Sequence, residues 1–355
     1  MSEREKHTQT GGQAVIEGVM MRSGNGLAVA VRRPDQAIVV RRSAWRQLAR
    51  GSKLWRRPFL RGGLVLVETL VNGIAALNFS AEVALEEEKG EQGDAGKSSP
   101  APVWFTVTLA VALALGLFVA LPHMAVWLGG KLSGRPLDVD DLSFHLIVGV
   151  VKLGVFVGYL ALISLMKDIR RLFAYHGAEH QSIHALEAGQ PLDVAHAAQH
   201  PPMHPRCGTT FLIMVVAVSI LVFALVFPPL IWLLGRPTGI GWLDQVIYVI
   251  IKLPLLVPIA GLAYELQRLT ARHQQRRWAR LLAWPGLFIQ RLTTRRPSAD
   301  QLEVALSSLL AARQQDADPA PAGSEPRLDV YEDFAAARLA LGGAAAEAGD
   351  VRQAG

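Results

Sequence analysis

The chain has 355 residues, of which 51% are hydrophobic, and a formal net charge of +6 at pH 7. The apolar residues gather in long runs, which excludes an ordinary soluble protein and predicts an integral membrane protein. Basic residues follow the edges of these runs without interleaved aromatic residues, so nucleic-acid binding is not expected. The single cysteine, Cys207, excludes an intramolecular disulfide and fits a reducing compartment.

Residues 1–57 are expected to form a soluble segment with a small β element. The stretches 27–32 and 37–42 are rich in β-branched residues and flank the turn-like sequence RPDQ, which predicts a β-hairpin. The glycine-rich stretch at 11–22 is expected to form a tight loop.

Residues 58–85 have an apolar sequence with one polar stripe. Glu68, Asn72, Asn78 and Glu82 recur at helical spacing. This pattern predicts an amphipathic helix that lies in the membrane interface or packs against the membrane helices, and a spanning helix is the alternative. Residues 86–102 follow as an acidic linker that is expected to be mobile.

The region 103–264 is expected to hold four membrane-spanning helices, at about 103–128, 142–166, 209–234 and 242–264. Lysine and arginine are concentrated before the first span, in the histidine-rich loop 167–208 and after Glu265. The positive-inside rule therefore predicts a multi-pass cell-membrane protein with both termini and this loop in the cytosol.

The C-terminal part is expected to leave the membrane. Residues 265–313 read as interfacial and cytosolic helices, with a capping box at Ser298 and Gln301. Residues 314–355 are expected to be a disordered tail without its own core. The predicted fold is thus mainly α, a polytopic helical membrane protein with a small N-terminal β-hairpin element and membrane lipids as its surroundings.

The sequence YHGAEHQSIHALE at 175–187 is the first candidate for chemistry. It has good helix formers and no proline, so it predicts a helix. At about 100° per residue, His176, His180, His184 and Glu187 share one face, with Glu179 at its margin. The order H-x-x-E-H is the inverted zincin pattern, in which two histidines one turn apart hold a metal ion and the glutamate acts as a general base.

The segment that returns to the membrane adds further ligand types. His196, His200, His204 and Cys207 lie in this segment. The alternatives are solvated histidines and a buried apolar cysteine. Arg206 could steady a developing anion, and the alternative is a basic side chain that reaches to the lipid headgroups. Glu17, between glycines in the N-terminal segment, could supply one more ligand or belong to a structural turn.

A divalent metal ion is therefore expected, first of all Zn²⁺, because imidazole and carboxylate ligands in an open tetrahedral site suit it. Mn²⁺ and Fe²⁺ are the alternatives. The candidate ligands are His176, His180, His184, Glu187, Glu17, His204 and Cys207.

Two lysines lie inside the predicted spans, Lys152 and Lys252. Charged side chains within a membrane are costly and are candidates for function. The alternative is that each lysine reaches to the interface along a shifted span.

Five sequence blocks together resemble one family: GGQAVIEGVMMR, PFLRG, YHGAEHQSIHALE, HPRCGTTFL, and PGLFIQRLTT with QLEVAL. This is the YqhQ-like bacterial membrane family, a domain of unknown function whose members are described as predicted metal-dependent enzymes. The resemblance covers roughly residues 11–313 and implies no substrate. It implies that six residues lie in characteristic blocks: Glu17, His176, Glu179, His180, His204 and Cys207. The stretch 194–199 departs from the expected pattern, which weakens the case for His196.

The leading hypothesis is a metal-dependent hydrolase at the cytosolic membrane surface, with Glu179 as base and a peptide or lipid substrate. The alternative is a non-enzymatic transporter or metal-responsive membrane factor. No sequence pattern sets an oligomeric state.

Overall fold

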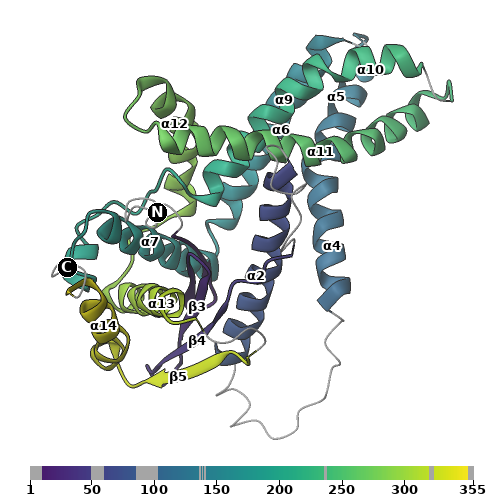
Figure 1. Ribbon diagram of the computed structural model, residues 1–355. Coiled ribbons are helices and arrows are strands. Elements are labelled where there is room, and N and C mark those ends of the chain that lie inside the picture. The colour runs from purple at the N-terminus through teal and green to yellow at the C-terminus, as the bar shows by residue number, and fades with distance from the viewer. Residues whose placement is uncertain are drawn as a thin grey trace, which may run out of the picture.

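The computed structural model describes residues 10–48, 60–84, 103–135, 137, 139, 141–235, 238–319 and 324–350. The chain is mainly helical, and a five-stranded sheet flanked by helices lies below a bundle of long helices (Figure 1). The predicted linker 86–102 lies outside the described residues.

The sheet is antiparallel throughout, with its strands in the order β1-β2-β3-β4-β5. The strands are β1 (Gly11–Val15), β2 (Gly18–Ser23), β3 (Gly26–Arg32), β4 (Ile38–Ala44) and β5 (Arg327–Tyr331). The predicted hairpin is the β3–β4 pair, in which Ala30 lies opposite Val40. The prediction of a loop at 11–22 is wrong, because this stretch forms the hairpin β1–β2. Its turn places Glu17 in the left-handed region, with φ of 51°.

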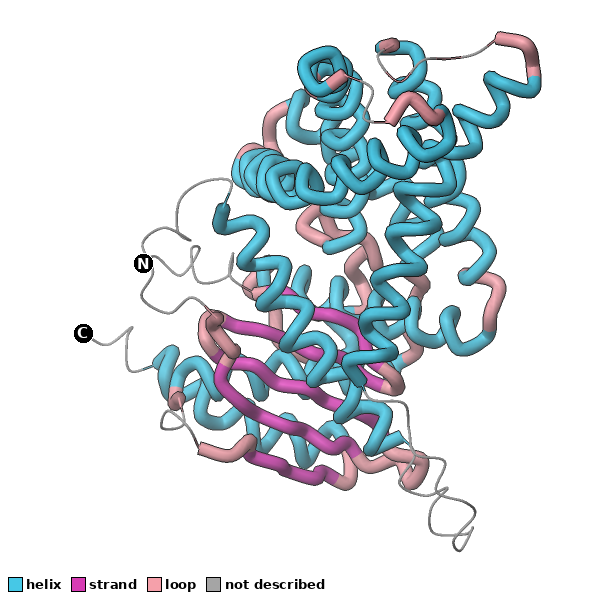
Figure 2. The backbone as a smooth tube through the Cα atoms, turned by 90° about the vertical axis from the view of Figure 1, so that its right-hand side faces the viewer, coloured by secondary structure: helices cyan, strands magenta, loops and turns pink. Residues whose placement is uncertain are grey.

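Both faces of the sheet are covered, because side chains alternate between them along each strand. One face packs against α7 (Lys167–Glu187) and α13 (Ala299–Ala317), and the other packs against α2 (Leu60–Ala84). Figure 2 shows the five strands side by side, with helices across the sheet and the bundle above it. The first face contributes Val19, Met21, Ala28, Ala30, Ile38 and Val40 to a core with α7 and α13.

The C-terminal segment is not the coreless tail that its composition predicts. Strand β5 pairs with β4, and Arg42 binds Asp329 at 2.6 Å. Helix α14 (Phe334–Asp350) follows and buries Ala337 and Leu341 in the core beside α13. An alanine-rich segment has little apolar area of its own, so only the existing sheet edge and core stabilise it.

The bundle is built from α4 (Val103–Leu115), the π-helical turn η2 (Gly116–Ala120), α5 (Leu121–Leu132), α6 (Leu142–Ile163), α9 (Gly208–Leu225), α10 (Phe227–Leu234) and α11 (Gly241–Arg272). Within the described residues, five helices are long and apolar enough to cross a membrane. Four of them correspond to the predicted spans, and α2 is the fifth. Large apolar side chains such as Val150, Leu225 and Trp232 are exposed on the bundle, as expected for contact with lipid.

Helix α2 connects the bundle to the sheet. Near its start, Gly62 lies against Gly261 of α11, and toward its end Phe79 lies in the core beneath the sheet. Its polar stripe has partners in the segment after β4: Glu68 accepts from the backbone of Leu48 at 2.9 Å. The first half of the stripe, Glu68 and Asn72, is therefore buried within the protein, whereas Asn78 and Glu82 are exposed.

Helices α12 (Arg277–Thr293) and α13 complete the fold. The capping box predicted at Ser298 and Gln301 is present at the start of α13. Between these two helices the chain crosses α7, where Arg295 donates its backbone N–H to the carbonyl of Phe173 at 2.9 Å. This crossing places the end of α12 beside the histidines.

Candidate metal centre

Helix α7 presents a row of histidines to the segment that leads into α9. The helix includes the predicted 175–187 stretch, begins earlier, at Lys167, and ends before Gly189, which adopts φ of 66°. Ring centroids of His176 and His180 lie 4.4 Å apart, and those of His184 and His204 lie 4.5 Å apart. The row divides into two groups of possible metal ligands.

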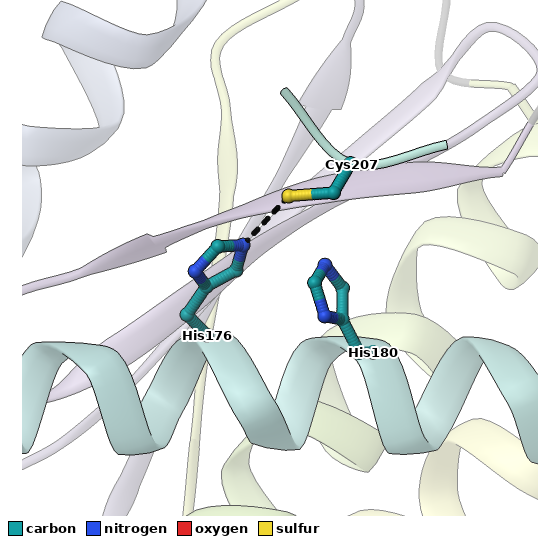
Figure 3. A group of neighbouring side chains, drawn as sticks. All are labelled: His176, His180 and Cys207. Carbon is teal, nitrogen blue, oxygen red and sulfur yellow. Dashed lines mark hydrogen bonds between the residues drawn. The ribbon is translucent and has the colours of Figure 1, made fainter. Parts of the chain in front are cut away.

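The first group, His176, His180 and Cys207, brings two imidazoles and a thiol together (Figure 3). One ligand atom from each residue lies within 4.8 Å of the others, and His176 Nε2 lies 3.1 Å from Cys207 Sγ. Bonds of about 2.0–2.1 Å to nitrogen and about 2.3 Å to sulfur at tetrahedral angles separate ligand atoms by roughly 3.3–3.6 Å. The separation of His176 and Cys207 is close to this value, and the other ligand atoms lie within 4.8 Å, a distance that small side-chain shifts can shorten.

Backbone carbonyls set the tautomers of both histidines. His176 Nδ1 lies 2.8 Å from the Thr293 carbonyl, and His180 Nδ1 lies 2.7 Å from the Pro202 carbonyl. Because a carbonyl only accepts, each Nδ1 carries the proton and each Nε2 has a free lone pair. A carbonyl bond at the far nitrogen is the usual way in which proteins orient a metal-binding imidazole.

One of these lone pairs has no partner. Among the described residues, His180 Nε2 is buried and makes no hydrogen bond. A buried polar atom without a partner is unfavourable, and a cation held between the rings and the thiol would satisfy it. The donor set and the orphaned atom both fit a divalent metal ion.

The surroundings of Cys207 favour its thiolate form. It caps the N-terminus of α9 and accepts the backbone N–H of Thr209 at 3.4 Å. Burial acts to raise the pKa of its thiol, but the influence of His180 and the bonds from Thr209 outweigh burial and lower that pKa. The thiolate is the form that binds metals.

Glu179 lies beside this group without belonging to it. Its side chain is buried between α7 and β1, where a Cβ on Gly12 would lie 3.0 Å from Glu179 Cγ and 2.5 Å from the carbonyl oxygen of Met20. Burial raises the pKa of Glu179 to about 7, against an opposing influence of His176. A carboxylate with this pKa can accept a proton near neutral pH.

Gly177 allows the segment after α12 to pass close to the backbone of α7. A Cβ at this position would lie 1.9 Å from the carbonyl oxygen of Arg295. Only glycine therefore allows the segment after α12 to cross α7 one residue from His176. The same crossing places the Thr293 carbonyl on the ring of His176.

The second group, His184, Glu187 and His204, has different bonding. His204 Nδ1 accepts the backbone N–H of Arg206 at 3.2 Å, so its Nε2 carries the proton and faces Glu187 at 3.4 Å. Arg206 forms an ion pair with Glu187. His184 Nε2 donates to the Met203 carbonyl at 2.9 Å. Burial, acting most strongly, lowers the pKa of both histidines to about 4.

The other predicted candidates lie apart from the first group. Glu17 binds Arg171 and accepts from Tyr175 Oη at 3.3 Å, so the structure does not bring it to either histidine group. His196 contacts Asp193 at 2.7 Å, and His200 contacts Gln190 at 2.7 Å. Arg206 lies in the second group through Glu187.

The sequence analysis did not predict the role of three residues that support the centre. Thr293 and Pro202 act through their carbonyls, which no side-chain pattern marks. Gln290 of α12 is buried and bonds the backbone N–H and carbonyl of His204, each at 2.8 Å, and the Thr210 hydroxyl at 2.9 Å. A lone glutamine in an interfacial helix gives no signal of this role.

Comparison with known proteins identifies the family of the chain. A family model described as "Protein of unknown function (DUF1385)" matches residues 57–315. The chain belongs to this family. It is 30% identical over 311 residues to the "Uncharacterized protein YqhQ" of Bacillus subtilis (strain 168), an alignment that covers 87% of this chain and 93% of that protein. The resemblance inferred from the five sequence blocks is thus confirmed, and no solved structure matches the chain.

Proposed function

We propose that this member of the DUF1385 family is a multi-pass membrane protein that binds one divalent metal ion, first of all Zn²⁺, between His176, His180 and Cys207. One observation carries the proposal: two imidazole lone pairs, each fixed by a carbonyl at the other ring nitrogen, converge on one thiol. Both termini and the sheet lie in the cytosol, in line with the distribution of basic residues.

The proposed activity is metal-dependent hydrolysis of a peptide or lipid at the membrane surface. Three protein ligands leave a position open, and a zinc ion bound there supplies a Lewis acid. Glu179 is the proton acceptor, since its pKa of about 7 matches that task. Arg206, expected to steady an anion, instead forms an ion pair with Glu187.

A metal-responsive membrane factor is the second candidate function, and the burial of the centre favours it. His180 is 1% exposed, Cys207 7% and Glu179 5%. Of the three proposed ligands, only His176 is partly exposed. A closed metal site that holds α7, α9 and α12 together needs no access for a substrate.

Elemental analysis of detergent-purified protein tests the metal. After incubation with zinc and gel filtration, the wild type is expected to retain one zinc per chain, and the His176→Ala/His180→Ala variant close to none. Equal, near-zero zinc in both would overturn the proposal.

Glu179→Gln separates the two functions. If the protein is a hydrolase, the variant retains zinc and loses turnover of a peptide or phospholipid substrate. Turnover equal to the wild type contradicts the role of Glu179, and absent turnover in both leaves the metal-responsive function as the favoured one. A topology reporter after Gly189 is expected in the cytosol, and a reading outside the cell would contradict the orientation.

A further inference from the structure

Two lysines that do not belong to the metal centre meet inside the helix bundle. Lys152 of α6 and Lys252 of α11 are 6% and 2% exposed. Their ammonium groups lie 5.0 and 5.3 Å from the centroid of the same ring, Phe223. Lys152 donates to the Ser219 hydroxyl at 3.2 Å, and Lys252 lies 2.8 Å from His123 Nδ1.

The bonding around this pair shows no negative charge. Among the described residues, neither lysine has an Asp or Glu within ion-pair distance. Asp244 lies on α11 eight residues before Lys252, about 12 Å along the helix, and accepts from Thr238 N and Oγ1 at 2.8 and 2.6 Å. Aromatic rings offset part of the cost of the two cations, but two buried like charges still favour an anion.

His145 packs against two of the aromatic rings that also surround Lys252. The centroid of the His145 ring lies 5.4 Å from those of Phe144 and Phe227, over which Lys252 Nζ also lies. His145 Nε2 lies 2.7 Å from the Val139 carbonyl, so it carries the proton and Nδ1 is an acceptor. His145 is only 2% exposed, and this buried Nδ1 has no hydrogen-bond partner in the described part of the chain.

A cavity of about 310 Å³ lies next to this cluster, lined among others by Val139, Gln245 and Tyr248. Gln245 Oε1 lies 2.9 Å from His123 Nε2, and His123 contacts Lys252. Val139, also in the cavity wall, accepts a hydrogen bond from His145 Nε2 through its backbone carbonyl. Two residues of the cavity wall therefore contact His123 and His145, the histidines beside the lysines. Other residues of the wall belong to α10 and the start of α11, whose end of the bundle is seen in Figure 1.

We propose that Lys152 and Lys252 bind an oxyanion that carries a hydroxyl group, as hydrogen phosphate and bicarbonate do. The anion oxygens accept from the two ammonium groups, and the hydroxyl donates to His145 Nδ1. This complementarity distinguishes the ligand from sulfate, which has no proton to donate at neutral pH. The site is separate from the metal centre and would exist whether or not the centre binds zinc.

The test uses full-length protein in detergent after metal removal with EDTA, and inorganic phosphate as the probe. Equilibrium dialysis with radiolabelled phosphate is expected to show saturable binding, and phosphate should raise the melting temperature more than sulfate at equal ionic strength. Lys152→Met and Lys252→Met should each weaken phosphate binding roughly 10- to 100-fold, the effect of one charged hydrogen bond. Lys167→Met, which changes an exposed lysine at the start of α7, is the matched control and should bind like the wild type.

Two further variants sharpen the result. His145→Phe is expected to remove the preference for phosphate over sulfate, and Cys207→Ala should leave phosphate binding unchanged. Gel filtration and circular dichroism establish that each variant is folded. Absence of saturable phosphate binding in the wild type would overturn the proposal, as would undiminished binding in the folded Lys152→Met/Lys252→Met variant.

Discussion

Each of the two histidine groups combines two residues of α7, four positions apart in the first group and three in the second, with one residue of the returning segment. The groups differ in the contacts of their ring nitrogens. In the first group, the Nδ1–H groups of His176 and His180 donate to carbonyls, so both Nε2 atoms are unprotonated and can bind a metal. In the second, both nitrogens of His204 are occupied by Arg206 N and Glu187, while His184 bonds a carbonyl as His176 and His180 do.

The difference shows that ligand types at metal-binding spacing do not by themselves define a metal site. A free lone pair requires that the rest of the ring be held by a neighbour that only accepts. In the second group the charge of Glu187 is neutralised by Arg206, so a cation there would have to displace an ion pair. We therefore expect one metal ion, in the first group.

Removing a ligand from each group should give the largest contrast. Cys207→Ala is expected to weaken zinc binding roughly 100-fold or more, since each ligand of a structural zinc site contributes a large share of the binding free energy. His184→Ala should change the affinity less than about tenfold. Competition with a chromophoric chelator measures both, and equal losses would show that the two groups act as one site.

Zinc should stabilise the fold only where the first group is intact. At a free zinc concentration about 100 times the dissociation constant, the free energy of unfolding is expected to rise by about 2.7 kcal/mol. Glu187→Gln should keep this gain and Cys207→Ala should lose it, as measured by thermal melting with and without zinc. A gain that depends on Glu187 would reverse the assignment of the two groups.

Gly177→Ala tests whether the chain crossing orients His176. The added methyl would lie 1.9 Å from the Arg295 carbonyl oxygen, so the segment must move and the Thr293 bond to His176 is disturbed. Zinc affinity should fall about 10- to 100-fold, the usual effect of losing a partner behind a metal-binding ring. Gly154→Ala, a helix glycine with open space around its Cβ, is the control and should not change zinc affinity.

The smallest effect is expected from the ion pair of the second group. Arg206 and Glu187 are 19% and 32% exposed, so solvent screens their attraction. Arg206→Met should lower the free energy of unfolding by at most about 1 kcal/mol and leave zinc content unchanged. Loss of zinc in this variant would mean that the loop 200–207 depends on the ion pair to present Cys207.

Helical periodicity was sufficient to predict the histidine face of α7, because the spacing of His176, His180 and His184 is a local property. The hairpin β3–β4 and the capping box at Ser298 were predictable for the same reason. Contacts that join distant segments were not: Thr293 and Pro202 contribute carbonyls, which every residue has. The pairing of Glu17 with Arg171 depends on the β1–β2 turn, and β5 depends on a sheet edge formed about 280 residues earlier.

X-ray absorption spectroscopy at the zinc edge tests the central claim most directly. Zinc bound to His176, His180 and Cys207 should show one sulfur neighbour at about 2.3 Å together with nitrogen or oxygen neighbours at about 2.0–2.1 Å. Cys207→Ala should abolish the sulfur signal. A zinc-loaded wild-type protein with only nitrogen and oxygen neighbours would contradict this assignment and place the metal in the second group or elsewhere.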